Sequence, residues 1–476
     1  MKALFFITFM SILTFNNLFC AEMNKQEADT FILLQKNYVQ FKNDHCNIFP
    51  TLHKDFDGKN AGQDLYRIKK LVHFAEHTYP ILHDKVKQLC TSFIHFKQQH
   101  GSEIEKTVYK NISLPSFIIR LLEKRPLTSI SSSNERCEAV RLRNDPTKTT
   151  IEDLNFNYIG THDEKAPLTL ENYLSYDEMK IAALIGLSGL TLFINDGDRS
   201  NNGVEGEFEQ KFFQHEGLYV GLVGARFEKP HKMEWQDIII TKEQNTKENG
   251  YGLHYCKNGL IGLWADVYGC KFPTYEEAKD HPDKYIQLDQ KYFNIEVYKK
   301  RIELVITPFL REANLRGEQQ NKKAYVHAVG LGTGTWAIHK KIQETAMITV
   351  YEEIIKKYHF PHISDIHFSW FGEATQSFAK PDETIIWKDK KKHKLLIQFS
   401  QRNPASKLVG TNDGKLLVAC YPWDSNAYPG NEYWIYSRTT SGNPAAACCS
   451  NIAILQNILI NPYIKENILK NYPSSS

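Results

Sequence analysis

A mostly apolar run leads directly into a glycine-rich turn in the stretch Ala324-Tyr325-Val326-His327-Ala328-Val329-Gly330-Leu331-Gly332-Thr333-Gly334-Thr335-Trp336. A short apolar run bounded by glycines is typical of a buried strand. Residues 338–358, which follow the turn, have the pattern of a helix. A strand, a tight turn and a helix in this order indicate an α/β fold.

Similar apolar runs alternate with helical patterns from about residue 140 onward, with glycine-rich turns between them. Strands that alternate with helices predict an α/β sheet that is largely parallel in its centre. The predicted strands are residues 190–194, 218–223, 238–240, 304–306, 324–329, 366–368, 395–397 and 416–419.

The part of the chain before residue 135 has a different pattern. Phe31, Leu34, Tyr38 and Phe41 recur near the helical period, and further periodic runs follow. We expect a helical N-terminal region over residues 21–135, a serine-rich linker near residues 129–134, and a second domain over residues 140–470.

The first twenty residues resemble a signal peptide. Lys2 precedes an apolar run over residues 3–15, which is too short to span a membrane. This predicts cleavage near residue 20, a secreted protein, and no stable membrane insertion afterwards. The formal charge of +3 gives no reason to expect a nucleic-acid partner. The remaining cysteines are widely scattered without zinc spacing, so we expect no metal.

The glycine-rich turn is the first candidate site. Glycines let the backbone approach an anion closely, and the following helix offers unpaired N–H groups, so the geometry suits a diphosphate. The ligand-binding candidates are Gly330, Gly332, Thr333, Gly334 and Trp336. The spacing is neither the dinucleotide pattern nor a P-loop. The first motif of an adenosylmethionine methyltransferase, or a tight turn without a ligand, are the alternatives.

The second candidate site is a polar loop after the predicted strand at residues 190–194. Loops at the carboxyl ends of parallel strands commonly bind ligands. Asparagine amides suit ribose hydroxyls, and carboxylates suit the activation of water or the stabilisation of a cationic sugar. A calcium or magnesium loop and a solvated turn are the alternatives. The candidates are the ligand-binding Asn195, Asp196, Asp198 and Asn202, and the catalytic Glu207 and Glu209.

The third candidate site follows the predicted strand at residues 416–419. Aromatic rings there suit stacking on a base, and the acids suit binding a sugar or acting on one. The alternative is a rigid loop whose aromatic side chains belong to the core. The candidates are the catalytic Asp424 and the ligand-binding Trp423, Asn426, Asn431 and Glu432. We expect all three loops to face one cleft.

Three stretches carry a family resemblance. Residues 217–228 (Gly-Leu-Tyr-Val-Gly-Leu-Val-Gly-Ala-Arg-Phe-Glu), 329–336 and 423–434 are similar to the MavL-like ADP-ribosyl hydrolase family. The order of motifs also resembles a macrodomain of the poly(ADP-ribose) glycohydrolase type, in which a strand ends in a stretch similar to residues 307–316. The chain departs from that type because Asn201-Asn202-Gly203 stands in place of a triple glycine.

The resemblance implies a macrodomain-like three-layer α/β/α sheet and an ADP-ribosyl hydrolase that cleaves the glycosidic bond of ADP-ribosylated proteins without a cofactor. It implies that residues 330–334 cradle the diphosphate, that Asn195 and Asn202 orient the distal ribose, and that Asp424, Glu207 or Glu209 supplies the catalytic acid. The partner would be ADP-ribose or an ADP-ribosylated protein. The family's founding examples are bacterial effectors, which implies action in a host cell. A non-catalytic ADP-ribose-binding module is the main alternative, and a methyltransferase is the other.

Overall fold

The structure is a computed structural model, and it describes residues 23–45, 65–126, 156–201, 203–206, 212–253, 259–372, 384–386, 393–423, 426–433, 448–449 and 451–472. The predicted signal peptide and the predicted linker lie outside the described residues. None of the helices described is both long enough and apolar enough to cross a membrane.

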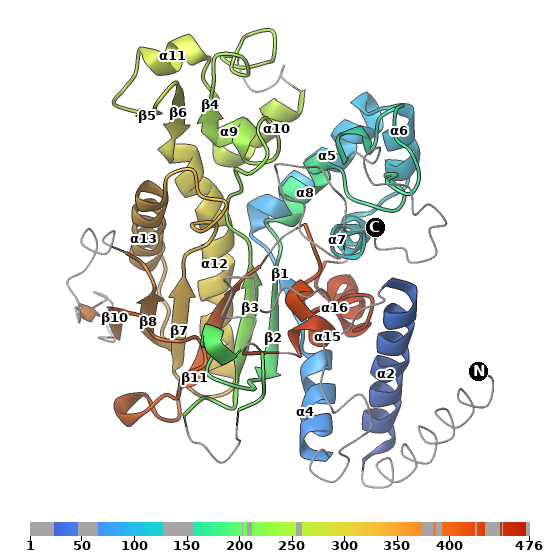
Figure 1. Cartoon of the computed structure of the whole chain (residues 1–476), viewed down its shortest axis with the longest axis vertical. Helices are drawn as coiled ribbons and strands as arrows, with labels where there is room; N and C mark the ends of the chain where they lie inside the picture. The colour runs from blue at the N-terminus through green and yellow to red at the C-terminus, as the bar shows by residue number, and fades with distance from the viewer. Residues whose placement is uncertain are drawn as a thin grey trace.

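An eight-stranded mixed sheet forms the centre of the molecule, in the order β1-β2-β3-β11-β7-β8-β10-β9 (Figure 1). The neighbours β3, β11, β7, β8 and β10 are parallel, whereas β2 is antiparallel to β3 and β9 is antiparallel to β10. The predicted α/β fold with a parallel centre is therefore confirmed. The strands are β1 (Tyr79–Ile81), β2 (Gly186–Leu192), β3 (Glu216–Leu222), β7 (Ala324–Val329), β8 (Ile363–Ser369), β9 (Thr384–Ile386), β10 (Lys394–Ser400) and β11 (Leu416–Pro422).

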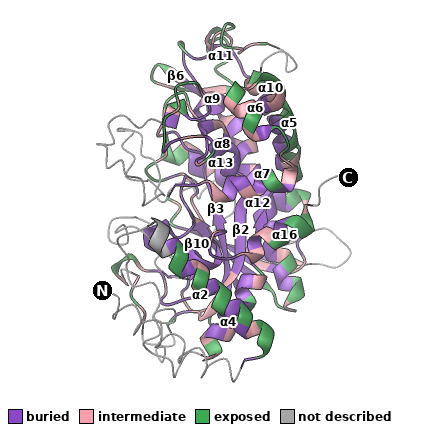
Figure 2. Cartoon of the chain, turned by 90° about the vertical axis from the view of Figure 1, so that its right-hand side faces the viewer, coloured by how far each residue is buried: buried purple, intermediate pink, exposed green. Residues whose placement is uncertain are grey.

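The five parallel strands give the sheet two functionally different edges. All five end at what we call the carboxyl edge and begin at the amino edge. Helices α12 (Ile295–Gln319) and α13 (Lys340–Lys357) pack together against one face, where Tyr351 of α13 meets Phe368 of β8 edge to face. Strands β2, β3, β7, β8 and β11 are almost wholly buried, whereas β10 is partly exposed (Figure 2). The sheet therefore positions loops rather than presenting an open surface.

The N-terminal region is helical, as predicted, but it also contributes a strand. Its described helices are α2 (Lys25–His45), α4 (Leu65–Glu76), α5 (Asp84–His100), α6 (Glu103–Tyr109) and α7 (Leu114–Glu123). Strand β1 lies between α4 and α5 and pairs with β2 of the main sheet. The division of the chain at residues 135–140 falls among residues that are not described and stays a prediction.

A smaller three-stranded sheet lies beyond the carboxyl edge (Figure 1). Helix α12 begins directly after β6 and ends shortly before β7, so its length separates the small sheet from the amino edge of the main sheet. The elements are β4 (Ile239–Ile240), β5 (Tyr285–Leu288), β6 (Lys291–Asn294), α9 (Trp235–Ile238), α10 (Gly259–Tyr268) and α11 (Tyr275–Lys279). The other helices are α8 (Tyr176–Ala182), α15 (Ile452–Leu455) and α16 (Tyr463–Asn471).

Two predicted strand features are wrong. Residues 304–306, predicted as a strand, and residues 307–316, compared with the end of a family strand, both lie inside helix α12. The Asn294 side chain caps this helix by accepting a hydrogen bond from the Val297 N–H. A short apolar run does not distinguish a buried strand from a buried helix, and here the longer helical pattern prevails. Of the run predicted at 238–240, only Ile239–Ile240 is a strand, and it belongs to the small sheet.

Candidate active site

The glycine-rich turn emerges from β7 at the carboxyl edge and leads into α13, as the sequence predicted. Gly332 has a φ of +65°, a conformation that favours glycine. Among the described residues, the amide N–H groups of residues 331–336 donate to no protein acceptor. Thr333 is buried, Trp336 is half-buried, and Gly334 is exposed with open space where a Cβ would lie. The turn therefore presents several free backbone donors on one short segment, which is the arrangement that suits an oxyanion.

Gln343 of α13 holds this turn in place. Its fully buried side-chain oxygen accepts hydrogen bonds from the N–H groups of Ile338, at 2.9 Å, and His339, at 3.0 Å. Its side-chain nitrogen donates to the carbonyl oxygen of Gly332 at 3.3 Å. One side chain thus ties the first turn of α13 back to the loop.

A buried ionic cluster fixes the neighbouring loop, which follows β3. Glu234 is fully buried between two arginines: Nε of Arg226 lies 3.3 Å from one carboxylate oxygen, and Nη2 of Arg301 lies 2.9 Å from the other. Burial alone would raise the pKa of Glu234, but the two guanidinium groups outweigh it and hold the pKa below its ordinary value. Arg301 also donates to the carbonyl oxygens of Val223 and Gly224. The cluster therefore sets the path of the backbone at Gly224.

Gly224 is the point at which the two loops touch. A Cβ on Gly224 would lie 2.5 Å from the carbonyl oxygen of Leu331 and closer still to the backbone nitrogen of Gly332. Only glycine permits this backbone-to-backbone approach. The position of the glycine-rich turn thus depends directly on the loop after β3.

The segment after β11 completes the carboxyl edge. The Asn426 side-chain oxygen accepts a hydrogen bond from Nη1 of Arg226 at 2.5 Å, which links this segment to the ionic cluster. Tyr421 donates from its hydroxyl group to the Glu432 carboxylate, 2.9 Å away. Oδ1 of Asn431 is buried and has no hydrogen-bond partner among the described residues. A buried acceptor without a partner is costly, so it is a natural contact point for a ligand.

Trp423 is part of the core rather than an open stacking surface. Its side chain is 2% exposed, its Nε1–H donates to the Ala427 carbonyl oxygen at 3.0 Å, and the Arg125 guanidinium lies 4.6 Å from its ring centre. This placement agrees with the alternative interpretation of a rigid loop whose aromatic side chains pack inside.

The Asn195 loop does not follow a parallel strand, so the expectation that three such strand ends share one edge is wrong. Its strand β2 is antiparallel to β3, with Leu192 opposite Glu216, so the loop starts at the amino edge. Hydrophobic periodicity identifies a strand but does not give its direction. Asn195 bonds within its own loop, to the Val204 carbonyl oxygen and the Gly197 N–H.

The two aspartates of that loop are likewise engaged by neighbouring amides. Asn403 donates to Asp196 at 2.9 Å and to Asp198 at 3.4 Å, and Asn201 donates to Asp196 at 2.7 Å. Side chains that could jointly hold a metal ion form no cluster within the described part of the chain. The loop therefore folds around its own carboxylates.

Four predicted site residues lie outside the described residues, namely Asp424, Glu207, Glu209 and Asn202. Nothing follows for their placement. Asp424 comes directly after the described Trp423 at the end of β11, and Glu207 comes directly after Gly206.

A pair of buried histidines lies on the strands beneath this edge. Nε2 of His327 is 3.1 Å from the Arg402 carbonyl oxygen, and Nε2 of His367 is 2.6 Å from the Ser400 hydroxyl oxygen. Burial and the nearby Arg402 charge lower the pKa of His327 to about 3 and that of His367 to about 4. Both imidazoles are therefore neutral at physiological pH and serve the core as uncharged hydrogen-bonding groups.

Sequence reasoning missed the residues that hold the loops. Gln343, Glu234 and Arg301 belong to no motif. Glu234 and Arg301 are 67 positions apart in the chain, whereas Gln343 bonds to residues within 11 positions of it. No local pattern marked them, because all three stand among other charged residues. Arg226 lay within a quoted family stretch but was not assigned a role.

Comparison with known proteins gives a consistent result. The family described as ADP-ribosylhydrolase MavL-like matches residues 58–470. An ADP-ribosylarginine hydrolase of Drosophila melanogaster is 34% identical over 463 residues, covering 93% of this chain and 85% of the relative. A second ADP-ribosylarginine hydrolase of the same organism is 32% identical over 397 residues, covering 80% of this chain and 76% of the relative.

Proposed function

Because the chain belongs to the MavL-like ADP-ribosylhydrolase family and is a hydrolase that removes ADP-ribose, we propose that the linkage it cleaves joins ADP-ribose to an arginine side chain. The two Drosophila relatives are named for this linkage. A guanidinium group bound to the anomeric carbon of the distal ribose is then the leaving group.

The observation that carries the assignment of the site is the juxtaposition at the carboxyl edge. Neighbouring strands β7 and β11 deliver, respectively, a turn with free backbone donors and a segment with the Glu432 carboxylate and an unpartnered Asn431 oxygen. Backbone donors suit the diphosphate, and an acid beside an amide suits a ribose. The diphosphate and a ribose of ADP-ribose thus find complementary groups on adjacent loops.

The proposed roles follow from these positions. Residues 330–336 bind the diphosphate, and Asn431 accepts a hydrogen bond from a ribose hydroxyl. We assign the acid that acts at the anomeric carbon to Glu432, positioned by Tyr421, or to Asp424, which follows β11 in the chain. Glu207 and Glu209 remain candidates for the same work. The Glu234 cluster holds the two loops at the required separation.

The reaction is a hydrolysis at the anomeric carbon. The bond from that carbon to the guanidino nitrogen breaks, and its electron pair leaves with the nitrogen, which takes up a proton. A water oxygen bonds to the carbon and gives up a proton to a carboxylate. The intervening state is like an oxocarbenium ion, which nearby negative charge stabilises. The products are free ADP-ribose and unmodified arginine.

The test uses proteins carrying ADP-ribose on arginine, on serine or on glutamate, and it measures released ADP-ribose. We expect rapid release only from arginine. Asp424→Asn and Glu432→Gln should each lower kcat/KM by about 10²-fold or more, as expected for loss of a catalytic acid or base. If Asp424→Asn and Glu432→Gln both retain activity, a loss of activity in Glu207→Gln or Glu209→Gln identifies the catalytic acid instead.

The exposed Glu296→Gln is the matched control, since Glu296 lies on the surface of α12 in an ion pair with Lys300. Release from serine or glutamate but not from arginine would refute the linkage. Full activity in all four carboxylate variants would refute the assignment of the site. Binding of ADP-ribose without release from any substrate would favour a binding module.

Two further features belong to the same proposal. We propose that the sheet and its loops have the macrodomain-like arrangement, which a crystal structure with ADP-ribose would test by showing whether the ligand touches residues 330–336. We also propose that residues 1–20 direct export, with N-terminal sequencing of the mature protein as the test.

A further inference from the structure

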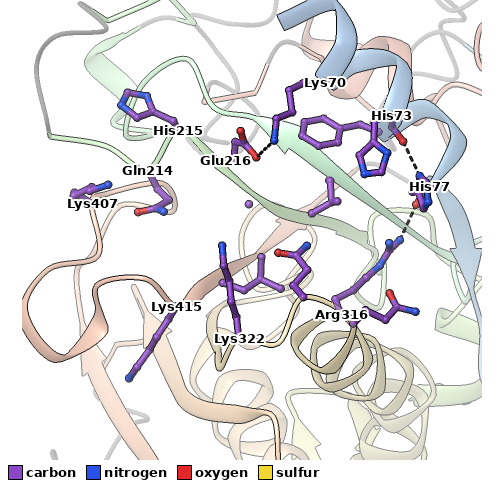
Figure 3. Close-up of a pocket in the computed structure, with 16 residues that line it drawn as sticks. Lys70, His73, His77, Gln214, His215, Glu216, Arg316, Lys322, Lys407 and Lys415 are labelled. Atoms are coloured by element: carbon purple, nitrogen blue, oxygen red, sulfur yellow. Dashed lines mark hydrogen bonds and ion pairs between the residues drawn. The ribbon is translucent and has the colours of Figure 1, made fainter. Parts of the chain in front are cut away.

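A basic pocket opens at the amino edge of the sheet, at the opposite end of the parallel strands from the candidate active site (Figure 3). Its walls come from α4, from the starts of β3 and β11, and from the end of α12 with the residues that lead into β7. Its volume is about 780 Å³. That volume lies within the range of pockets that hold small organic ligands, roughly 300–1,000 Å³.

The side chains that line this pocket are strongly biased toward positive charge. Five cationic side chains line it, namely Lys70, Arg316, Lys322, Lys407 and Lys415, whereas Glu216 is the one carboxylate among the lining residues. Such a bias in a concave site concentrates field lines and attracts anions.

Three of the five cations are already paired. Lys70 lies 3.0 Å from Glu216, Arg316 lies 2.7 Å from Glu312, and Lys415 pairs with Asp365. Figure 3 shows the Lys415 side chain pointing away from the centre of the pocket. In each of these three pairs the positive charge is balanced by a carboxylate, so the pairs stabilise the fold and are not available to bind an anion.

Lys322 and Lys407 are different, because neither side-chain ammonium group has a carboxylate or hydrogen-bond partner among the described residues, although both backbone N–H groups are hydrogen-bonded. Lys322 comes from the turn between α12 and β7, and Lys407 comes from the connection between β10 and β11. Figure 3 shows both side chains on the walls of the same pocket. Two positive charges from separate parts of the chain thus line the same pocket, and neither is paired with a carboxylate among the described residues.

Polar side chains complete the lining. Gln214 contributes an amide, and the rings of His73, His77 and His215 add imidazole nitrogens. Phe74 of the same helix is only 2% exposed and offers a ligand little apolar surface. Cationic side chains beside amide and imidazole groups match phosphate oxygens, and the volume of the pocket leaves room for an organic body attached to them.

We propose that this basic pocket is a second binding site of the protein, for a phosphate-bearing small molecule of nucleotide size. Lys322 and Lys407 bind the phosphate oxygens. The site is separate from the hydrolytic one, because the parallel strands run between them from the amino edge to the carboxyl edge.

The experiment measures binding of pyrophosphate and of ADP by calorimetry to the full chain. The variant Lys322→Ala/Lys407→Ala is compared with Lys110→Ala/Lys470→Ala, which removes two exposed lysines that do not line the pocket. Loss of one charge-assisted hydrogen bond weakens binding by about tenfold or more, so the first variant, which removes two lysines, should weaken pyrophosphate binding at the pocket by about 10²-fold or more. The control variant should bind as the wild type does.

Two readouts separate the pocket from the glycine-rich turn. Release of ADP-ribose should be unchanged in Lys322→Ala/Lys407→Ala, and Gly224→Ala should keep the pocket's affinity for pyrophosphate while losing activity. Equal pyrophosphate affinity in the wild type and Lys322→Ala/Lys407→Ala overturns the proposal. So does a result in which the pocket lysines affect binding of an acidic peptide but of neither pyrophosphate nor ADP, since the surface then recognises protein.

Discussion

Replacing Gly224 by alanine tests whether the contact between two loops sets the geometry of the hydrolytic site. The added Cβ would lie 2.5 Å from the carbonyl oxygen of Leu331, whereas ordinary van der Waals contact begins at 3.4 Å. The obstructing atoms are backbone atoms, which cannot rotate away as the end of a flexible side chain can. The glycine-rich turn and the loop after β3 must therefore move apart by about 1 Å to admit the methyl group.

This displacement should lower both the activity and the stability of the protein. A displacement of about 1 Å at a site that positions substrate costs roughly 10²-fold in rate, so kcat/KM for release of ADP-ribose should fall by about that factor. Overpacking should lower the free energy of unfolding by about 1–3 kcal/mol. The assays are ADP-ribose release from an arginine-modified protein and urea unfolding followed by circular dichroism.

Gly334→Ala is the matched control for stability, because a Cβ at Gly334 meets nothing within 4 Å. This variant should unfold at the wild-type urea concentration, while its KM reports whether the open space beside the turn is used by substrate. The reasoning fails if Gly224→Ala is folded and retains wild-type kcat/KM, or if Gly334→Ala is as unstable as Gly224→Ala.

Four other substitutions test the groups that surround the site. Glu234→Gln removes the carboxylate charge between two buried guanidinium groups, so the free energy of unfolding in urea should fall by about 3–5 kcal/mol. The exposed Glu296→Gln should lower it by less than about 0.5 kcal/mol. Equal losses in the two variants would contradict the role of the cluster. The lowered pKa values of His327 and His367, about 3 and about 4, give stability that is present above their ordinary pKa of 6.5 and is lost as the pH falls toward the folded values. Below about pH 6, each histidine should lower the free energy of unfolding by up to about 1.4 kcal/mol per pH unit. His327→Gln or His367→Gln should make this pH dependence shallower in urea titrations. An unchanged slope in both variants would contradict the role of the two histidines. Tyr421→Phe removes the hydroxyl donor of a buried carboxylate and should lower the free energy of unfolding by about 1–3 kcal/mol together with kcat; wild-type turnover would show that this donor has no positioning role.

The parts of the fold that the sequence predicted well are those with strong local signals. The β7 strand, the glycine-rich turn and the α13 helix are adjacent in the chain, and each has its own pattern of apolar residues and glycines. The strand predicted at residues 304–306 is wrong because a run of three apolar residues is compatible with either a strand or a helix. Only the length of the surrounding helix, capped at Asn294, settles the choice.

The candidate site was predictable in its loops but not in its supports. The glycines at 330, 332 and 334 predict a turn that can approach an anion closely, and the acids after β11 can be identified from the sequence. Strand direction is not visible, which is why the Asn195 loop was expected at the wrong edge. The partnership of Arg226, Glu234 and Arg301 joins residues up to 75 positions apart, 226 to 301, and no periodic pattern encodes such a pairing.

The two edges of the sheet differ in how they treat charge, and that difference argues for two kinds of binding. At the carboxyl edge, Arg226 and Arg301 are buried and engaged with Glu234, so the groups on the glycine-rich turn that suit an anion are backbone N–H groups, which hold a diphosphate at a fixed place without a mobile side chain. At the amino edge, Lys322 and Lys407 are flexible point charges at the surface without carboxylate partners among the described residues. Rigid donors suit chemistry at one anomeric carbon, whereas mobile lysines suit reversible binding of ligands that differ in shape. Salt should therefore weaken pyrophosphate binding at the pocket far more than it raises the KM of the hydrolytic reaction, since salt screens exposed charges more strongly than it affects uncharged backbone donors.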